Sequence, residues 1–356
     1  MCFPKSGFKT INAPEVFEEG RFEDFKKGGY YPVNNGEVFG SKYQVVGKLG
    51  FGVTSTVWLA RDLKEHQYVS LKIYKLQEAD WEEFEVYKRL NQGNSSHPGH
   101  GHVRKALGML TIPRVGGDHY CFVQRPTWES FGDLLHRNPS HRFTEELLKA
   151  GLMQVFLALG YFHAECQLVH TGGGEKDTSI LDMFAKAEID NPSPRKFIND
   201  APVYASRQLG LLKRFRDVVL GDFSSAVRGN MTRNHDAQPN VYQSPEIWDL
   251  FEGKHMFYGN DPDGKGYSTR AHLGEAIGML GSPPIDLLER GVRSHEFFAE
   301  NATWKSSVAV PQYTSLERSE EFLEGKNKDM FLVFMRGTLQ WRPEDRKTAS
   351  YWMILG

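Results

Sequence analysis

Two apolar segments that meet at a pair of glycines constrain the fold of this chain more than any other part of its sequence. Residues 43–49 and 55–60 have the alternating pattern of β-strands, and Gly50 and Gly52 lie between them. Glycine lets the backbone approach a bound group closely, and backbone N–H groups in such a turn suit an anion such as phosphate. A single glycine pair between strands is more often only a turn, so the residues downstream decide between a turn and a nucleotide site.

Val57 and Lys72 favour the nucleotide site. Val57 is spaced to cover a flat ring, and Lys72, in the next apolar segment, would place a cation in the same cleft. A dinucleotide-binding fingerprint is disfavoured, because that motif opens a helix and here a second strand follows. The hairpin, Val57 and Lys72 resemble the nucleotide-binding half of a protein kinase. The resemblance implies that ATP is enclosed by Leu49, Gly50, Phe51, Gly52, Val53, Ser55, Val57 and Lys72.

Residues 29–59 carry a more specific resemblance. They are similar to the kinases that phosphorylate serine/arginine-rich splicing factors, most closely to the short fungal-type members, in which a serine commonly occupies the third glycine position, as Ser55 does here. The resemblance implies an α+β, two-lobed protein kinase fold. A small antiparallel β lobe with one helix is expected over 40–126 and a larger, mainly helical lobe over 127–356. Residues 1–39 are expected to be an extension without a core of its own.

The same resemblance implies a reaction, the transfer of the γ-phosphate of ATP, with Mg²⁺, to serine in Arg/Ser-rich protein segments. In such kinases a glutamate on the helix after the lysine strand holds the lysine over the phosphates. Residues 79–90 have apolar residues at helical spacing, and Glu83 matches that glutamate best. Glu85 is the rival candidate, and a simple surface glutamate is the alternative without a function.

The catalytic loop departs from the family pattern. Residues 166–171 resemble the lead-in to this loop, where the family continues with Asp, a lysine and an asparagine. Here Gly172 takes the place of the aspartate and Ser179 that of the metal-binding asparagine. Lys176 matches the lysine, which would reach the γ-phosphate, only if a short insertion is allowed. A glycine cannot accept a proton, so a neighbouring carboxylate, Glu175 or Asp177, is the possible substitute.

The metal-binding segment is better preserved. Residues 218–227 resemble the family's Asp-Phe-Gly-Ser-Ala-Val segment, in which the aspartate binds the magnesium ion that bridges the phosphates. Asp222 keeps this carboxylate, while Ser224 replaces the glycine. The resemblance therefore implies a magnesium site with Asp222 and, at the asparagine position, Ser179.

The second half of the chain matches the helical lobe with one gap. Glu246 would pair with Arg346, the buried ion pair of a kinase C-lobe. After Glu246 the family has a loop and the start of a central helix whose aspartate organises the catalytic loop. Here the chain passes directly to residues that resemble the later part of that helix, and Asp249 is a weak candidate for the missing aspartate.

Three explanations of these departures stay open. The chain is an active serine/threonine kinase in which another carboxylate or water replaces the base, or it is a pseudokinase that binds nucleotide or protein without phosphotransfer. Alternatively, the gap and the glycine run come from an imperfect transcript or gene model.

Composition limits the partners and the compartment. The 356 residues carry a formal net charge of −2, which gives no reason to expect nucleic-acid binding. Three scattered cysteines imply no disulfide framework, and the histidines between 97 and 119 lack paired metal-ligand spacing. The N-terminus lacks a signal peptide's apolar core, and the apolar stretch near 152–162 is judged too short to span a membrane. A monomer in the cytoplasm, the nucleus or both is expected.

Overall fold

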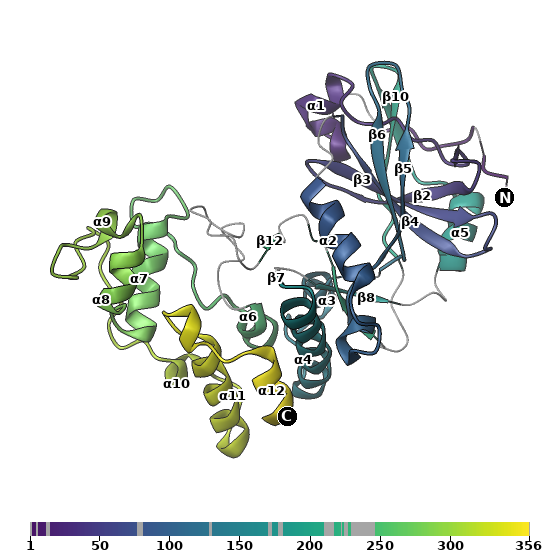
Figure 1. Ribbon diagram of the computed structural model, residues 1–356. Coiled ribbons are helices and arrows are strands. Elements are labelled where there is room, and N and C mark those ends of the chain that lie inside the picture. Colours follow the sequence, from purple (N-terminus) through teal and green to yellow (C-terminus); the bar gives the residue numbers. More distant parts are fainter. Residues whose placement is uncertain are drawn as a thin grey trace. The chain divides into compact units, whose positions relative to one another are not determined.

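The computed structural model describes residues 2–4, 6–11, 15–76, 81–127, 130–169, 173–176, 181–209, 217–221, 223, 227–228 and 246–355 (Figure 1). The chain forms two compact units. The first comprises Met1–Ser130 and Tyr161–Arg228, and the second Phe131–Gly160 and Gly229–Gly356. Residues 161–228 thus group with the sheet of the first unit. The lobe boundary itself stays a prediction.

A six-stranded antiparallel sheet forms the centre of the first unit. Its order is β1 (Val38–Phe39), β2 (Tyr43–Phe51), β3 (Ser55–Asp62), β4 (Tyr68–Tyr74), β6 (His119–Gln124) and β5 (Ala106–Ile112). Val57 lies opposite Lys72 and Trp58 opposite Leu71. Because side chains alternate along a strand, Val57 and Lys72 share one face of the sheet, and Trp58 and Leu71 share the other.

The face that carries Trp58 and Leu71 holds the larger core of the first unit. Segments from both ends of this unit complete that core, including Val33 from the N-terminal part and Tyr204, whose ring meets Trp58 edge-on at 5.7 Å. The segment expected to be a coreless extension therefore contributes buried side chains. The cluster consists of Val33, Phe39, Tyr43, Val45, Trp58, Ala60, Val69, Leu71, Ile73, Ile112, Cys121, Val123 and Tyr204.

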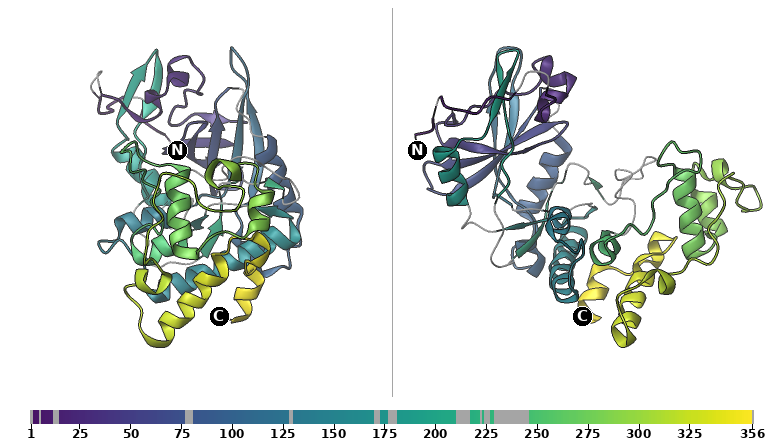
Figure 2. Two further views of the ribbon diagram at one scale, coloured as in Figure 1. Left: turned by 90° about the vertical axis from the view of Figure 1, so that its left-hand side faces the viewer. Right: turned by 180° about the vertical axis from the view of Figure 1, so that it is seen from behind.

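The remaining elements of the first unit surround this sheet. Before the sheet lie η1 (Glu18–Arg21) and α1 (Glu23–Lys26), and α2 (Trp81–Gln92) and η2 (Pro98–His102) lie within its sequence. After it come η3 (Tyr161–Glu165), β7 (Leu168–Val169), β8 (Gly173–Lys176), α5 (Leu181–Asp190), β9 (Arg195–Ile198), β10 (Ala201–Tyr204), β11 (Asp217–Leu220) and β12 (Val227–Arg228). β9–β10, β8–β11 and β7–β12 are antiparallel pairs, and α5 packs against β2 (Figure 2).

Buried charged groups connect residues 181–209 and the N-terminal segment to β2. The Lys48 ammonium is fully buried and donates to the carboxylates of Glu18 and Glu19 and to the Tyr204 carbonyl. The Arg207 N–H donates to the Lys48 carbonyl at 3.0 Å. A charged group that is removed from water is destabilising unless it has ion-pair and hydrogen-bond partners of this kind. The contacts of Lys48 therefore link three segments that are distant in the sequence.

The second unit is helical among its described residues. It contains α3 (Phe131–Arg137), α4 (Glu145–Gly160), α6 (Glu246–Glu252), α7 (Thr269–Leu280), α8 (Ile285–Arg290), α9 (Ser294–Phe297), α10 (Leu316–Ser319), α11 (Gly325–Thr338), η6 (Pro343–Asp345) and α12 (Ala349–Leu355). Trp248 of α6 is 1% exposed and stacks on Phe331 of α11. Trp352 of α12 meets Phe334 of α11, and the two helices lie side by side (Figure 2).

A long helix covers Glu145–Glu165. Its 21 residues are enough, by length and composition, to cross a membrane, which corrects the judgement that this stretch is too short. A core helix of a folded domain passes the same test. The α4 part packs against α6 and α12 within the second unit, where the Leu148 side chain is buried.

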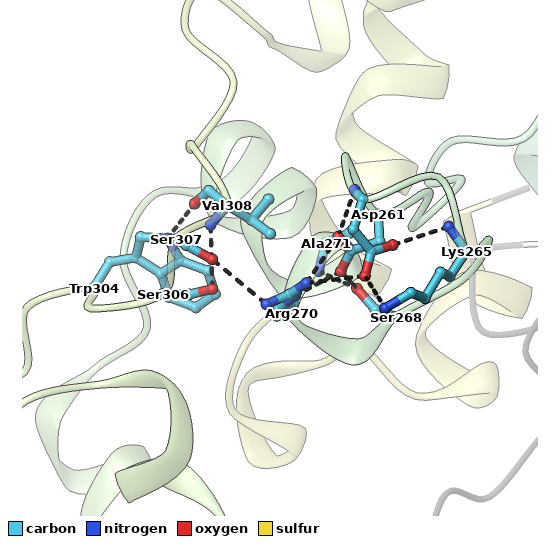
Figure 3. A network of polar contacts seen from close by, with 10 residues as sticks. Asp261, Lys265, Ser268, Arg270, Ala271, Trp304, Ser306, Ser307 and Val308 are labelled. Atoms are coloured by element: carbon cyan, nitrogen blue, oxygen red, sulfur yellow. Dashed lines mark hydrogen bonds and ion pairs between the residues drawn. The ribbon is translucent and has the colours of Figure 1, made fainter.

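In the loop before α7, the Asp261 carboxylate is paired with the nearby Arg270 guanidinium. The Asp261 carboxylate accepts hydrogen bonds from Arg270 Nε at 2.5 Å, Arg270 Nη2 at 2.9 Å and Ser268 Oγ at 2.6 Å (Figure 3). The Arg270 guanidinium, followed by Ser268, holds the pKa of Asp261 below its usual value. Two aspartates near a glycine could suggest a cation site, but here Arg270 supplies the positive charge. Among the described residues no cluster of three or more potential metal ligands occurs.

Glu252 gives the second unit a pH-dependent stability. Burial, followed by the nearby Glu320 carboxylate, raises the pKa of Glu252 to about 7. A folded-state pKa above the unfolded value stabilises the fold at acidic pH, and this contribution is lost as the pH rises through about 7. We expect Glu252→Gln to stabilise the protein by about 2 kcal/mol at pH 8 and to have no effect at pH 4.5. Urea unfolding at both values checks this, with Glu289→Gln, an exposed residue of α8, as the control; equal effects of Glu252→Gln at the two pH values would contradict it.

Candidate active site

An ion pair between β4 and α2 is the centre of the candidate site. Lys72 Nζ donates to Glu83 Oε1 at 2.9 Å and to Oε2 at 3.0 Å. The Glu83 side chain is completely buried, and that of Lys72 is 14% exposed. The lysine therefore lies at the edge of the interior, held from behind by a carboxylate. The sequence predicted this pairing, and the rival Glu85 instead lies 3.6 Å from the exposed Lys88.

Tyr74 strengthens the ion pair and was missed in the sequence. Its hydroxyl donates to Glu83 Oε2, and the Lys72 ammonium lies 5.0 Å from the centre of its ring. Tyr74 follows Lys72 by two positions on the same strand, so both side chains project from one face. This period of two is the signal that could have identified it.

The glycine hairpin lies beside this ion pair in the same sheet. Gly50 is opposite Val57, and Val57 is opposite Lys72, so the three are neighbours across β2, β3 and β4. A side chain added at Gly50 would meet no atom within 4 Å, which leaves room above the hairpin. One N–H of the turn, that of Gly52, donates to the Ser55 carbonyl at 2.8 Å. Other N–H groups of the tip must then supply any phosphate contact.

The other predicted nucleotide-binding residues differ in exposure. Val53 at the tip is 64% exposed, whereas Ser55 is buried. Leu49 packs against a cluster that includes Leu181 and Phe184 of α5. The Phe51 ring contacts Phe22 and lies near the Arg21 guanidinium. Leu49 and Phe51 therefore join the hairpin to the segments that flank the sheet, and their roles toward a nucleotide stay predictions.

Phe223, the residue after Asp222, lies next to α2, and Leu220, two residues before Asp222, lies next to Arg104. Leu220 accepts a hydrogen bond from the Arg104 N–H at 2.7 Å. Phe223 is fully buried, with its ring 5.2 Å from that of Tyr87 on α2 and 5.3 Å from that of Phe162. The helix that presents Glu83 therefore also packs against the segment that contains Asp222. Asp222 itself lies outside the described residues.

Several predicted residues cannot be placed. Gly172, Asp177 and Ser179 lie outside the described residues, as do the side chains of Glu175, Lys176 and Glu246. Lys176 belongs to β8, where its backbone is opposite Asp217 of β11, so it lies in a strand. Its proposed contact with the γ-phosphate stays a prediction. Arg346 is exposed, and its Nε donates to the Gln340 carbonyl at 3.0 Å, so the expected burial of a Glu246–Arg346 pair is wrong.

Asp249 makes contacts within its own unit. Its carboxylate lies 2.5 Å from His255 Nδ1 and accepts a hydrogen bond from the Met256 N–H at 3.3 Å. Burial raises the pKa of Asp249, while His255 opposes this shift. Its role as a substitute for the missing helix aspartate stays a prediction.

Arg104 is a further residue that the sequence did not identify. Its guanidinium Nη2 donates to Ser70 Oγ at 3.0 Å and lies 3.4 Å from the Arg125 carbonyl. Arg104 thereby connects β4, the residue after β6 and, through its own N–H, β11. No local sequence pattern predicts such contacts, because the partners of Arg104 come from three separate segments.

Comparison with known proteins decides the family. No family model matches the chain. A serine/threonine protein kinase of Aspergillus fumigatus is 38% identical over 371 residues, covering 97% of this chain and 91% of the relative. The chain belongs to the serine/threonine protein kinase family. A serine/threonine-protein kinase SRPK of Physarum polycephalum is 28% identical, covering 93% of this kinase chain and 89% of its own length.

The fold agrees with this membership. A crystal structure of a kinase domain superposes on the chain with a TM-score of 0.67 at 14% identity, covering 91% of this chain and 97% of the other. At that identity the likeness shows the fold alone. The predicted two-lobed kinase fold class and the resemblance to the kinase superfamily are confirmed.

Proposed function

We propose that this kinase binds ATP with magnesium and transfers the γ-phosphate to serine in Arg/Ser-rich protein segments. The observation that carries the proposal is the Lys72–Glu83 ion pair beside the glycine hairpin. A buried carboxylate that holds a partly exposed ammonium preorganises a positive charge, and such preorganisation supplies much of the catalysis in phosphoryl transfer.

The described residues provide the chemical groups that ATP binding requires. Lys72 offers a fixed cation for phosphates, the hairpin offers backbone N–H groups, and Val57 offers an apolar surface for a flat base. Magnesium, when bound, neutralises phosphate charge. Asp222 and Ser179 would hold it, and the burial of Phe223 beside α2 supports the placement of Asp222 near the lysine.

The choice of substrate rests on the family resemblance. The Physarum relative carries the name SRPK, and the resemblance in residues 29–59 points to the same branch. We propose a monomer that acts on protein rather than on nucleic acid or a membrane, in the cytoplasm, the nucleus or both. The near-neutral net charge of −2 agrees with a protein substrate.

A pseudokinase is the second candidate, and one observation favours it. Gly172 stands where the family has its catalytic aspartate, so the chain lacks the carboxylate that orients the substrate hydroxyl. Loss of a general base typically lowers a rate about 10²–10⁴-fold, which leaves measurable turnover. Binding of ATP is common to the active kinase and to a nucleotide-binding pseudokinase, and only phosphotransfer separates them.

Restoring a carboxylate at position 172 distinguishes the active kinase from the pseudokinase. We expect wild type to transfer radiolabelled phosphate to an Arg/Ser peptide slowly, and Gly172→Asp to do so about 10²–10⁴-fold faster. Gly174→Asp adds the same charge two positions further on and is expected to leave the rate unchanged. If wild type does not exceed background, whether or not Gly172→Asp does, the phosphotransfer proposal is wrong and the pseudokinase is supported.

A further inference from the structure

A side chain from the N-terminal segment contacts the tip of the glycine hairpin. The Tyr30 hydroxyl lies 3.0 Å from the Gly52 carbonyl oxygen and 2.5 Å from the Val53 carbonyl oxygen. A hydroxyl has one proton, so the two acceptors share it, with the closer Val53 oxygen taking the stronger hydrogen bond. Tyr30 is only 3% exposed, which shields this contact from competing water.

Tyr30 lies on the sheet face opposite Lys72, in a small cluster with Phe25 and Val203. Its ring stacks on that of Phe22, which in turn contacts the ring of Phe51 at the end of β2. Phe51 is paired with Thr56, and Thr56 projects from the opposite face to its strand neighbour Val57, which is paired with Lys72. Tyr30 therefore reaches the hairpin from the face that does not carry the cation.

This contact fixes the direction of two N–H groups. In a planar trans peptide the C=O and the N–H point in opposite directions. The Gly52 carbonyl shares a peptide with the Val53 N–H, and the Val53 carbonyl shares one with the Thr54 N–H. Because both carbonyls turn toward Tyr30, both N–H groups turn toward the face of Lys72. Two successive N–H groups beside a cation suit a phosphate.

Two other backbone groups of the hairpin tip already have hydrogen-bond partners. The Gly52 N–H donates to the Ser55 carbonyl at 2.8 Å, and the Thr54 carbonyl accepts from the Lys75 N–H at 2.9 Å. Glycine at positions 50 and 52 would otherwise let these peptides rotate at low cost. Together with these contacts, the Tyr30 hydroxyl holds the peptides of the hairpin tip in one orientation.

We propose that Tyr30 is a positioning residue that orients the Val53 and Thr54 N–H groups toward the phosphates of ATP. This inference rests on the proposed function, because it deepens the phosphate-binding role of the hairpin. Tyr30 acts through the backbone of the hairpin and does not itself touch the reacting atoms.

Hydrogen exchange of the nucleotide-free protein tests the positioning directly. Tyr30→Phe keeps the ring in its cluster and removes only the hydroxyl. We expect amide exchange over residues 51–54 to accelerate about tenfold, while β3 and β4 exchange as in wild type and so report an intact fold. Tyr31→Phe is the matched control, because that hydroxyl donates to Glu37 at 2.8 Å, away from the tip. Equal exchange at the tip in Tyr30→Phe and wild type would overturn the proposal.

Nucleotide affinity separates this proposal from the proposed function. We expect Tyr30→Phe to bind ATP about tenfold more weakly than wild type and adenosine equally well, because adenosine lacks the phosphates. If wild type binds ATP and Tyr30→Phe binds it as tightly, the positioning role alone is overturned. If wild type binds no ATP, the proposed function falls, and with it the role of Tyr30 toward the nucleotide.

Discussion

Replacing Lys72 by methionine is expected to lower phosphate transfer to an Arg/Ser peptide about 10²–10³-fold, to the background of the assay. Methionine has a similar length but no charge, so the preorganised cation beside Glu83 is lost while the strand is kept. Glu83 then remains buried without its lysine, although the Tyr74 hydroxyl still donates to it. Radiolabelled transfer at saturating ATP measures the effect.

Lys75→Met is the matched control for this prediction. Lys75 follows β4 by one residue and pairs with the half-exposed Asp24 at 2.6 Å. We expect its substitution to change transfer less than threefold. If Lys72→Met transfers phosphate as fast as wild type, the assignment of Lys72 is wrong.

Replacing Lys48 by methionine is expected to lower the free energy of unfolding by about 3–5 kcal/mol. The ammonium is fully buried and donates to Glu19, Glu18 and the Tyr204 carbonyl. Its removal leaves the buried Glu19 without its cation, and an uncompensated buried charge is strongly destabilising. Burial already raises the pKa of Glu19, with Lys48 opposing that shift. Urea unfolding measures the loss.

A double variant separates the charge effect from a packing effect. Glu19→Gln together with Lys48→Met removes both charges, so we expect it to recover more than half of the lost stability. If the double variant is as unstable as Lys48→Met, the loss comes from packing and the account of the buried charges is wrong.

The core of the site could be predicted from local patterns. Lys72 stands in an apolar strand, and Glu83 in a helix with acids on one face, so the periodicity of each element and the order of the two were visible in the sequence. The glycine hairpin was visible because its two strands alternate. These features depend on residues that are close together along the chain.

Contacts between distant segments could not be predicted in this way. The acids and lysines crowded before residue 28 are typical of a solvated extension, yet Glu19 is buried against Lys48. Tyr30 reaches Gly52, and Tyr204 reaches Trp58, across sequence separations over which no periodic pattern exists. Burial of a charge becomes favourable only once its partner is in place, and a single sequence does not display that pairing.

Calorimetric titration with ATP and magnesium tests most directly whether Lys72 and Asp222 act on one triphosphate. We predict that wild type binds one ATP per chain, and that Lys72→Met and Asp222→Asn each weaken binding at least tenfold while leaving adenosine affinity unchanged. Absence of ATP binding by wild type, or wild-type affinity in both variants, would contradict the account.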